Sequence, residues 1–287
     1  MKYLLALFPL SLWALPVDNP CEPSLYYTKM VWCACDEFCK SEFTVRVGFS
    51  GDYIFNRQME VDASDNSSDI RRVSFYTNAG YLSLNLWNRF DLFSLFGTTS
   101  SYMEATSSAF SGAPIIGLTV SPNETICFDM ATNWSWGAGV RFSTISWCNF
   151  CFGIEGAYFY TSPNMASIAG DTVSILTTYP NGLSFKYHEW LLAFGTTYRF
   201  CIDETWDVLP YFSVEWNPAR VTMDGASVRL GNPLVEAYDI TLHPLQQQQA
   251  WGYVLGLTLL GNEAFSLNLE GRFVSQRALA FNAQILF

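Results

Sequence analysis

Charged side chains recur at alternate positions within segments that otherwise alternate between apolar and small residues. Guanidinium and carboxylate groups on one face of a sheet can pair and brace it, or they can create a field across a water-filled passage that sorts solutes by charge. The sequence leaves both interpretations open. The residues concerned, candidates for lining a pore, are Arg46, Arg141, Glu155, Glu189, Arg199, Glu215, Glu270 and Arg272.

Eight cysteines form the second group with chemical potential. In an exported chain an even number of cysteines favours disulfides, either within the chain or to other envelope proteins. The two closely spaced clusters lack the paired spacing and neighbouring histidine of a zinc site, so we expect no metal and no cofactor. The disulfide candidates are Cys21, Cys33, Cys35, Cys39, Cys127, Cys148, Cys151 and Cys201.

The histidines argue against an enzyme. A hydrolase needs a nucleophile beside a general base, and the usual base is a histidine. His188 and His243 are the two in the chain. His188 is expected near the outer end of a strand, beside Glu189, so we expect no catalytic residues.

The N-terminus predicts export. Lys2 precedes an apolar run over residues 3–13 and then the small residue Ala14, which is the pattern of a signal peptide at 1–14, cleaved after Ala14. The run is shorter than the about 20 residues that a membrane-spanning helix needs. We expect a cysteine-containing periplasmic segment at 15–41 and a barrel at 42–287.

Composition supports a membrane sheet. Hydrophobic residues make up 50% of the chain and charged residues 14%, against about 25% charged in ordinary soluble domains. A closed sheet satisfies its backbone hydrogen bonds in lipid without long apolar helices. The 26 acidic residues outnumber the 15 basic ones, which argues against nucleic-acid partners.

The last nine residues alternate strictly. One face carries Leu279, Phe281, Ala283, Ile285 and Phe287, and the other carries Ala280, Asn282 and Gln284. An exported chain that ends in such a strand is typical of a bacterial outer-membrane barrel, with a lipid-facing apolar side and a polar interior. Phe281, Ile285 and Phe287 are the expected assembly signal.

Alternation elsewhere predicts an all-β fold, a transmembrane antiparallel β-barrel of about 12 strands. Short turns at 88–89, 122–123, 147–149, 201–206 and 261–262 then fall on the periplasmic side, and the long connections 56–70, 162–183 and 218–248 fall outside. A hairpin within 218–248 would raise the count to 14, and 14–16 strands are possible. The expected strands are 42–55, 71–87, 90–103, 113–120, 124–132, 134–146, 150–161, 184–200, 207–217, 249–260, 264–275 and 279–287.

The order of these segments resembles the chlamydial major outer membrane protein and its porin paralogues. The similarity lies in LPVDNPCEPS at 15–24, GDYIF at 51–55, EW at 189–190 through residues 197–199 to PY at 210–211, LEGRF at 269–273, SQRA at 275–278 and the final Phe287. This chain differs in its shorter outer loops between residues 56 and 183.

The resemblance implies a multi-pass porin of the cell outer membrane. It would pass small hydrophilic solutes, with carboxylates among the candidates, and form a homotrimer in an envelope stiffened by disulfides. Two other hypotheses remain open. One is a non-conducting structural or adhesin-type barrel whose interior is filled by 218–248, and the other is a soluble, secreted, disulfide-rich β-sandwich.

Overall fold

The fold was analysed in a computed structural model of the 287-residue chain. The structure describes residues 18–24, 43–62, 70–106, 110–111, 125–147, 149–170, 185–203, 205–223, 226–228, 238–242, 244–261 and 264–287.

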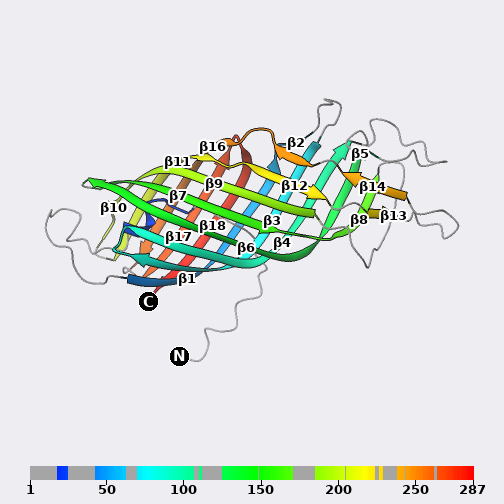
Figure 1. Ribbon diagram of the computed structural model, residues 1–287. Helices are drawn as coiled ribbons and strands as arrows, with labels where there is room; N and C mark the ends of the chain where they lie inside the picture. The colour runs from blue at the N-terminus through cyan, green and yellow to red at the C-terminus, as the bar shows by residue number, and fades with distance from the viewer. Residues whose placement is uncertain are drawn as a thin grey trace.

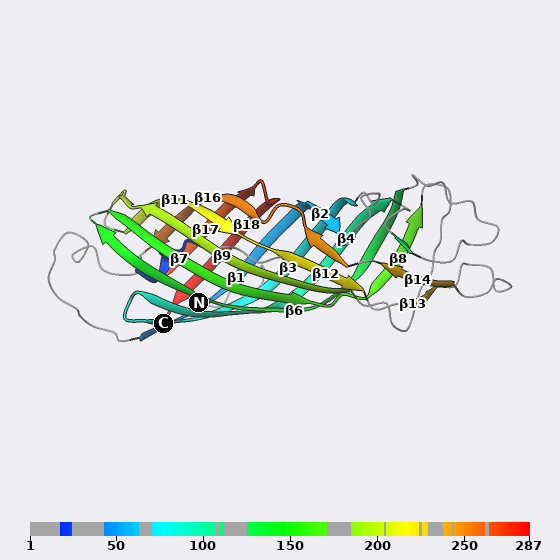
Figure 2. The same ribbon diagram turned by 45° about the horizontal axis from the view of Figure 1, so that its top comes forward.

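Ten tilted strands of the described chain form the wall of an antiparallel β-barrel (Figures 1 and 2). They run side by side in the order β11, β16, β17, β18, β1, β3, β4, β6, β7 and β9, and pairing of β9 with β11 closes the wall. The wall strands are β1 (Phe43–Arg57), β3 (Ile70–Leu86), β4 (Phe90–Thr106), β6 (Thr125–Trp147), β7 (Phe150–Thr161), β9 (Phe185–Tyr198), β11 (Trp206–Trp216), β16 (Trp251–Gly261), β17 (Phe265–Phe273) and β18 (Gln276–Leu286).

The two ends of the barrel differ. At one end, called here the short-turn end, brief connections join β3 to β4, β6 to β7, β9 to β11 and β16 to β17, and the C-terminus lies there too (Figure 1). At the opposite, long-loop end lie β5, β8, β13 and β14 (Figure 1). In outer-membrane barrels short turns face the periplasm, so this arrangement fits the expected orientation.

Smaller elements extend the wall. β12 continues the sheet along the outer half of β9, where Ala219 to Met223 pair with Glu189 to Phe185. Within the described residues, no helix is long and apolar enough to cross a membrane. The remaining elements are β2 (Met59–Val61), β5 (Phe110–Ser111), β8 (Met165–Gly170), β10 (Phe200–Cys201), β12 (Ala219–Met223), β13 (Ala226–Val228), β14 (Tyr238–Leu242), β15 (Leu245–Gln247) and the 3-10 turn η1 (Glu22–Ser24).

The predicted barrel is confirmed, but its described wall has ten strands in place of the expected about 12. The expected strands 124–132 and 134–146 are one strand, the 23-residue β6. Pairing with β4 shifts register there, since Thr99 faces Asn133 whereas Ser101 faces Met130. A bulge reverses the phase of alternation without ending the strand, which explains why a break was expected at Asn133.

The expected strand 113–120 and the turn at 122–123 lie outside the described residues. The segment 218–248 does contain an antiparallel pair, β12 with β15, but these short strands extend the long-loop end and do not cross with the wall strands. A count of 14 is therefore wrong for the described wall.

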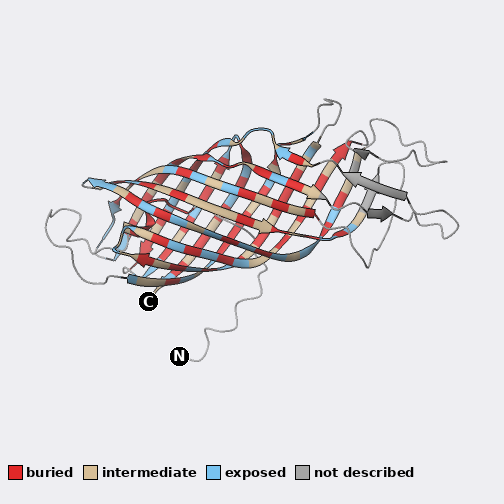
Figure 3. Cartoon of the chain, in the orientation of Figure 1, coloured by how far each residue is buried: buried red, intermediate tan, exposed pale blue. Residues whose placement is uncertain are grey.

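The wall alternates as a barrel in lipid should. Burial changes from residue to residue along nearly every strand (Figure 3). The outer face carries exposed apolar side chains such as Leu82, Trp136 and Leu269, whereas polar side chains such as Ser83, Arg141 and Asn268 are buried on the inner face. The separation of faces predicted from the C-terminal strand thus holds around the barrel.

The long-loop half of the interior is filled by apolar side chains. This apolar cluster draws on inward positions of most wall strands and includes the ring pair Phe75 and Tyr187, whose centroids are 4.2 Å apart. Its members are Ile54, Met59, Val73, Phe75, Met103, Ala105, Phe128, Met130, Phe159, Met165, Phe185, Tyr187, Ala219, Val221, Leu245 and Ala278.

Leu269 offers a test of the lipid-facing side. It lies mid-strand in β17, is 50% exposed and pairs in register with Leu257 and Phe281. A charge at this depth costs about 2–4 kcal/mol, so Leu269→Arg should lower the unfolding free energy in lipid bilayers by that amount. Urea titration of bilayer-inserted protein measures it, with Leu269→Met as control. Equal midpoints for both variants would contradict a lipid-facing Leu269.

Candidate functional site: the barrel interior

Residues 18–24 lie inside the barrel, in the half near the short turns. The sequence places residues 15–41 in a periplasmic segment; of these, the structure describes 18–24, called here the inner segment. Asp18 to Pro23 are all buried. A stretch close to the N-terminus thus contacts wall strands that come much later in the chain.

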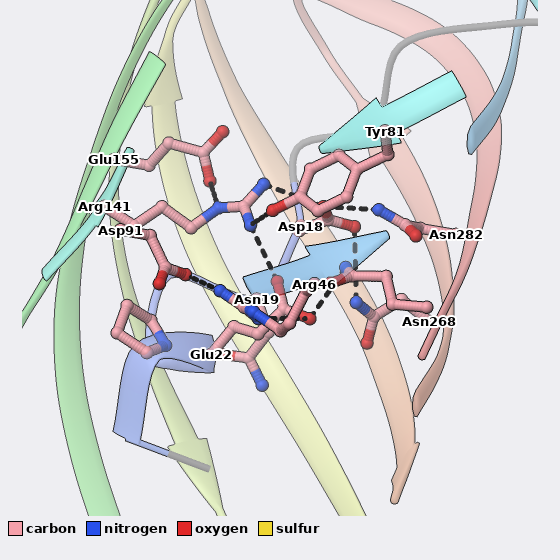
Figure 4. A network of polar contacts seen from close by, with 12 residues as sticks. Asp18, Asn19, Glu22, Arg46, Tyr81, Asp91, Arg141, Glu155, Asn268 and Asn282 are labelled. Atoms are coloured by element: carbon pink, nitrogen blue, oxygen red, sulfur yellow. Dashed lines mark hydrogen bonds and ion pairs between the residues drawn. The ribbon is translucent and has the colours of Figure 1, made fainter. Parts of the chain in front are cut away.

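The inner segment is folded by its own hydrogen bonds. The Asn19 side-chain oxygen accepts the Cys21 N–H at 3.0 Å, an arrangement that Asn favours in turns. The Glu22 N–H donates to the Asn19 carbonyl at 2.8 Å, and the Ser24 N–H donates to the Cys21 carbonyl at 3.0 Å. This compact turn directs the carboxylates of Asp18 and Glu22 toward the wall (Figure 4).

Arg141 of β6 is the centre of the contacts with the inner segment. Its Nη2 lies 2.7 Å from Asp18 Oδ2, its Nη1 lies 2.7 Å from Glu22 Oε2, and its Nε lies 2.8 Å from Oε2 of Glu155 on β7 (Figure 4). The Arg141 guanidinium carbon also lies 4.2 Å from the centre of the Phe93 ring. One guanidinium therefore joins two carboxylates of the inner segment to the wall.

The same two carboxylates contact the wall on its other side. Asp18 accepts hydrogen bonds from Asn268 Nδ2 at 3.2 Å and from Asn282 Nδ2 at 2.6 Å. Glu22 Oε1 accepts one from Gln284 Nε2 at 2.8 Å and lies 3.2 Å from Arg46 Nη1. Arg46 in turn pairs with Asp91 of β4. Contacts from β1, β6, β17 and β18 thus meet on the inner segment.

Two glycines allow the inner segment to approach the wall. A Cβ atom at Gly153 of β7 would lie 2.2 Å from the Pro20 carbonyl oxygen, and one at Gly195 of β9 would lie 2.9 Å from Pro20 Cγ. Any larger side chain at Gly153 would occupy the space that Pro20 fills. The wall is therefore complementary to the inner segment in shape as well as in charge.

At Glu22, the cost of burying the carboxylate competes with its attraction to two guanidinium groups. Complete burial raises the pKa of the Glu22 carboxyl to about 7, although Arg46 and Arg141 oppose that shift. Burial disfavours the charged form of a carboxyl, and a nearby guanidinium favours it. The ion pairs consequently offset only part of the cost of burying this carboxylate.

The eight charged residues singled out in the sequence all lie on the inner side of the wall. Arg46, Arg141, Glu155, Glu215, Glu270 and Arg272 are at most 2% exposed, as is Arg199, and Glu189 is 8% exposed. Arg46, Arg141 and Glu155 belong to the network around the inner segment.

The remaining charges form separate pairs along the interior. Arg272 pairs with Asp52 and Glu270, and Glu270 also accepts a hydrogen bond from Tyr211 at 2.9 Å. Glu189 lies 2.8 Å from Arg57 Nη2. Arg199 pairs with Asp207, and Glu215 accepts a hydrogen bond from the Ser275 hydroxyl at 2.6 Å. These contacts agree with the bracing interpretation.

Several interior residues were missed in the sequence. Asp52 lies two residues after the inward-facing Ser50, so continuing the alternation by one step places Asp52 on the inner face as well. Arg57 follows a register shift after Ile54, which hides its inward position. Asp18 and Glu22 precede the first strand, and no local pattern marks them as interior residues.

The cysteines and His188 complete the inventory. Cys21, Cys127 and Cys151 form no disulfide within the described part of the chain, Cys201 is exposed, and the other four disulfide candidates lie outside the described residues. Cys21 and Cys151 are both buried in one small cluster, and the Ser24 hydroxyl lies 3.4 Å from Cys151 Sγ. His188 bonds the Tyr158 hydroxyl at 2.7 Å and lies in the opposite strand phase from Glu189.

Comparisons place the chain among known proteins. A family model described as Chlamydia major outer membrane protein matches residues 4–74 and 65–161. The chain is 25% identical to a major outer membrane porin of Chlamydia abortus over 380 residues, covering 97% of this chain and 96% of that protein. A major outer membrane porin of Chlamydia pneumoniae is 23% identical, with 96% and 95% covered.

Among solved structures, the outer membrane protease OmpT from Escherichia coli aligns with a TM-score of 0.41 and 10% identity, covering 88% of this chain and 100% of that one. This likeness is too distant to indicate a function.

Arg272 tests whether the interior pairs brace the barrel. Arg272→Gln leaves Asp52 and Glu270 buried without their guanidinium, and breaking a buried pair costs about 3–5 kcal/mol. The unfolding free energy of the variant should fall by that amount. The control is Arg220→Gln, because Arg220 pairs with Asp62 at 58% and 41% side-chain exposure, where such pairs contribute about 0–1 kcal/mol. Equal losses for the two variants would contradict a bracing role.

Proposed function

This chain belongs to the Chlamydia major outer membrane protein family, and we propose that it is a porin through which small hydrophilic solutes diffuse. It is a multi-pass protein of the outer membrane. The porin names of its relatives support the proposal, and those relatives align with nearly the whole chain. On this proposal the protein is a channel and performs no catalysis.

The observation that carries the proposal is the separation of the two faces of the closed wall. Apolar side chains cover the outside, and arginine, glutamate, asparagine and serine side chains line much of the inside. A closed sheet leaves no strand edge unpaired in lipid, and a polar inner wall can be wetted. A barrel needs both properties if solutes are to diffuse through a water-filled passage across the outer membrane.

The described conformation is closed. The inner segment fills the short-turn half, and the apolar cluster fills the long-loop half. Diffusion therefore requires both to rearrange. An apolar constriction can itself act as a gate, because water leaves a narrow apolar passage.

Carboxylates are the solutes that the interior favours. Arg141 already holds two carboxylates that do not belong to the wall, those of Asp18 and Glu22, at 2.7 Å each. Guanidinium groups bind carboxylates through short, charge-assisted hydrogen bonds. If the inner segment withdraws, a carboxylate solute can take the same contacts with Arg141 and Arg46.

We extend the proposal to assembly. A disulfide from Cys33, Cys35 or Cys39, which precede the first wall strand in the sequence, would link the barrel to other periplasm-facing proteins. Outer-membrane lipid is the partner of the apolar exterior, and a homotrimer is the expected oligomer.

A non-conducting structural barrel is the second candidate. The filled interior favours it, because a barrel that only braces the envelope has no need of a passage. Among the described residues, the interior is filled by the inner segment and the apolar cluster. The expected 218–248 stretch contributes Ala219, Val221 and Leu245 to that cluster.

Single-channel recording separates the two candidates. Refolded protein in planar bilayers should give discrete conductance steps that scale with salt concentration, and liposomes containing it should swell in isotonic solutions of small carboxylates. Heat-denatured protein is the control for bilayer leakage. Folded, inserted protein that gives no steps at either polarity would favour the structural barrel over the porin.

A further inference from the structure

We propose that the inner segment, residues 18–24, is a reversible plug that closes the short-turn half of the barrel and leaves its seat to open that half to water. Its role as a gate rests on the proposed porin function. The seat and its exchange with water do not, since they concern the inner segment and the wall alone.

The seat is built for this segment. Asp18 and Glu22 together contact Arg46, Arg141, Asn268, Asn282 and Gln284, which come from four wall strands. Asn19 Nδ2 lies 3.3 Å from the hydroxyl of Thr197 and 3.2 Å from that of Thr258. With Gly153 and Gly195 making room for Pro20, both shape and charge of the interior match the plug.

Side chains, and not strand pairing, attach the plug to the wall. The two backbone-to-backbone hydrogen bonds found for residues 18–24 are both internal to the segment. The plug carbonyls of Cys21 and Pro23 accept bonds from the side chains of Ser143 and Asn85. Wall closure through β9 and β11 does not involve the plug, so the barrel can persist when the plug leaves.

The forces on the plug favour exchange. Its residues are Asp, Asn, Pro, Cys, Glu, Pro and Ser, so it buries little apolar surface beyond the two prolines and Cys21. Burying ion pairs costs desolvation that can equal or exceed their attraction, and here the charges on both sides regain water when the plug leaves. The raised pKa of Glu22 agrees with this balance. Separating the side chains of the apolar cluster would expose apolar surface to water, with no charged groups that regain hydration. The apolar cluster is therefore the more permanent closure.

The exit lies at the short-turn end. The wall residues around the plug, including Asn85, Ser143, Cys151 and Thr197, are within a few residues of the short turns. The plug can therefore withdraw without passing the apolar cluster. With cleavage after Ala14, as the sequence predicts, the plug begins close to the N-terminus of the mature chain and is joined to β1 through residues 25–42 alone.

Cys151 reports whether the seat is filled. It faces inward beneath the plug, is 0% exposed and lies next to Ser24. The experiment uses the full mature chain, folded in detergent, with the other seven cysteines changed to serine. The probe is a negatively charged methanethiosulfonate, which forms a mixed disulfide with the thiolate and releases methanesulfinate. The measured quantity is the labelling rate of Cys151.

Two variants displace the plug by different means. Gly153→Ala puts a methyl group where Pro20 lies, and Asp18→Asn with Glu22→Gln removes both carboxylates while retaining wall charges. Each should raise the Cys151 labelling rate at least tenfold. The matched control is Gly156→Ala in the same strand, where a Cβ meets no atom closer than 3.9 Å and labelling should match the parent. Heat-modifiable gel mobility checks folding, and if one variant fails to fold the other decides.

The outcomes are distinct. Fast labelling in the folded parent, or unchanged rates in both displacing variants, would overturn the plug. Bilayer recording of the same variants then tests the gate: more frequent conductance steps support it. Faster labelling with no increase in conductance would leave the plug established and would count against its role as the gate, because the apolar cluster would then still close the long-loop half. The recording of the parent protein decides the porin function itself.

Discussion

A buried guanidinium must be met by negative charge, and the Arg141 side chain is where this constraint organises the protein. Arg141 is 0% exposed and contacts Asp18, Glu22 and Glu155. An unpaired charge in such a place would cost several kcal/mol. The wall supplies one carboxylate from the neighbouring strand, and a segment near the N-terminus supplies the other two. Arg141 therefore links the inward-facing side of the wall strands to the segment that fills the short-turn half of the interior.

The two halves of the interior are closed by different kinds of interaction. In the long-loop half, apolar side chains pack together, and their separation would expose apolar surface to water. In the short-turn half, the contacts are ion pairs and amide hydrogen bonds that water can replace at little net cost. A barrel closed in this way keeps its fold while the polar half exchanges, which is what a gated channel requires and what a permanent brace does not need.

The strands and their faces could be predicted because alternation is a local property. Glu189 in β9 is buried on the inner face, whereas Leu279 and Ile285 in β18 are exposed on the outer face, as the alternation predicts. The strand number was wrong where a bulge near Asn133 reverses the phase as a turn would. The plug was missed because its contacts with the wall span 24 to 264 positions and leave no local pattern. Only the wall sites opposite, such as Gly153, reflect its presence.

Disulfide trapping of the plug tests the central claim most directly. In the folded full-length mature protein with Cys21 and Cys151 as its only cysteines, copper phenanthroline lets dioxygen take two electrons and two protons from the thiols to form one disulfide. We expect rapid, near-complete intramolecular cross-linking, seen as the loss of two hydrogens in intact mass. A chain that retains only Cys21 and Cys127, which lies at the far end of β6, should stay reduced. Folded protein in which Cys21 and Cys151 do not join, or join no faster than the control pair, would contradict a plug seated in the barrel.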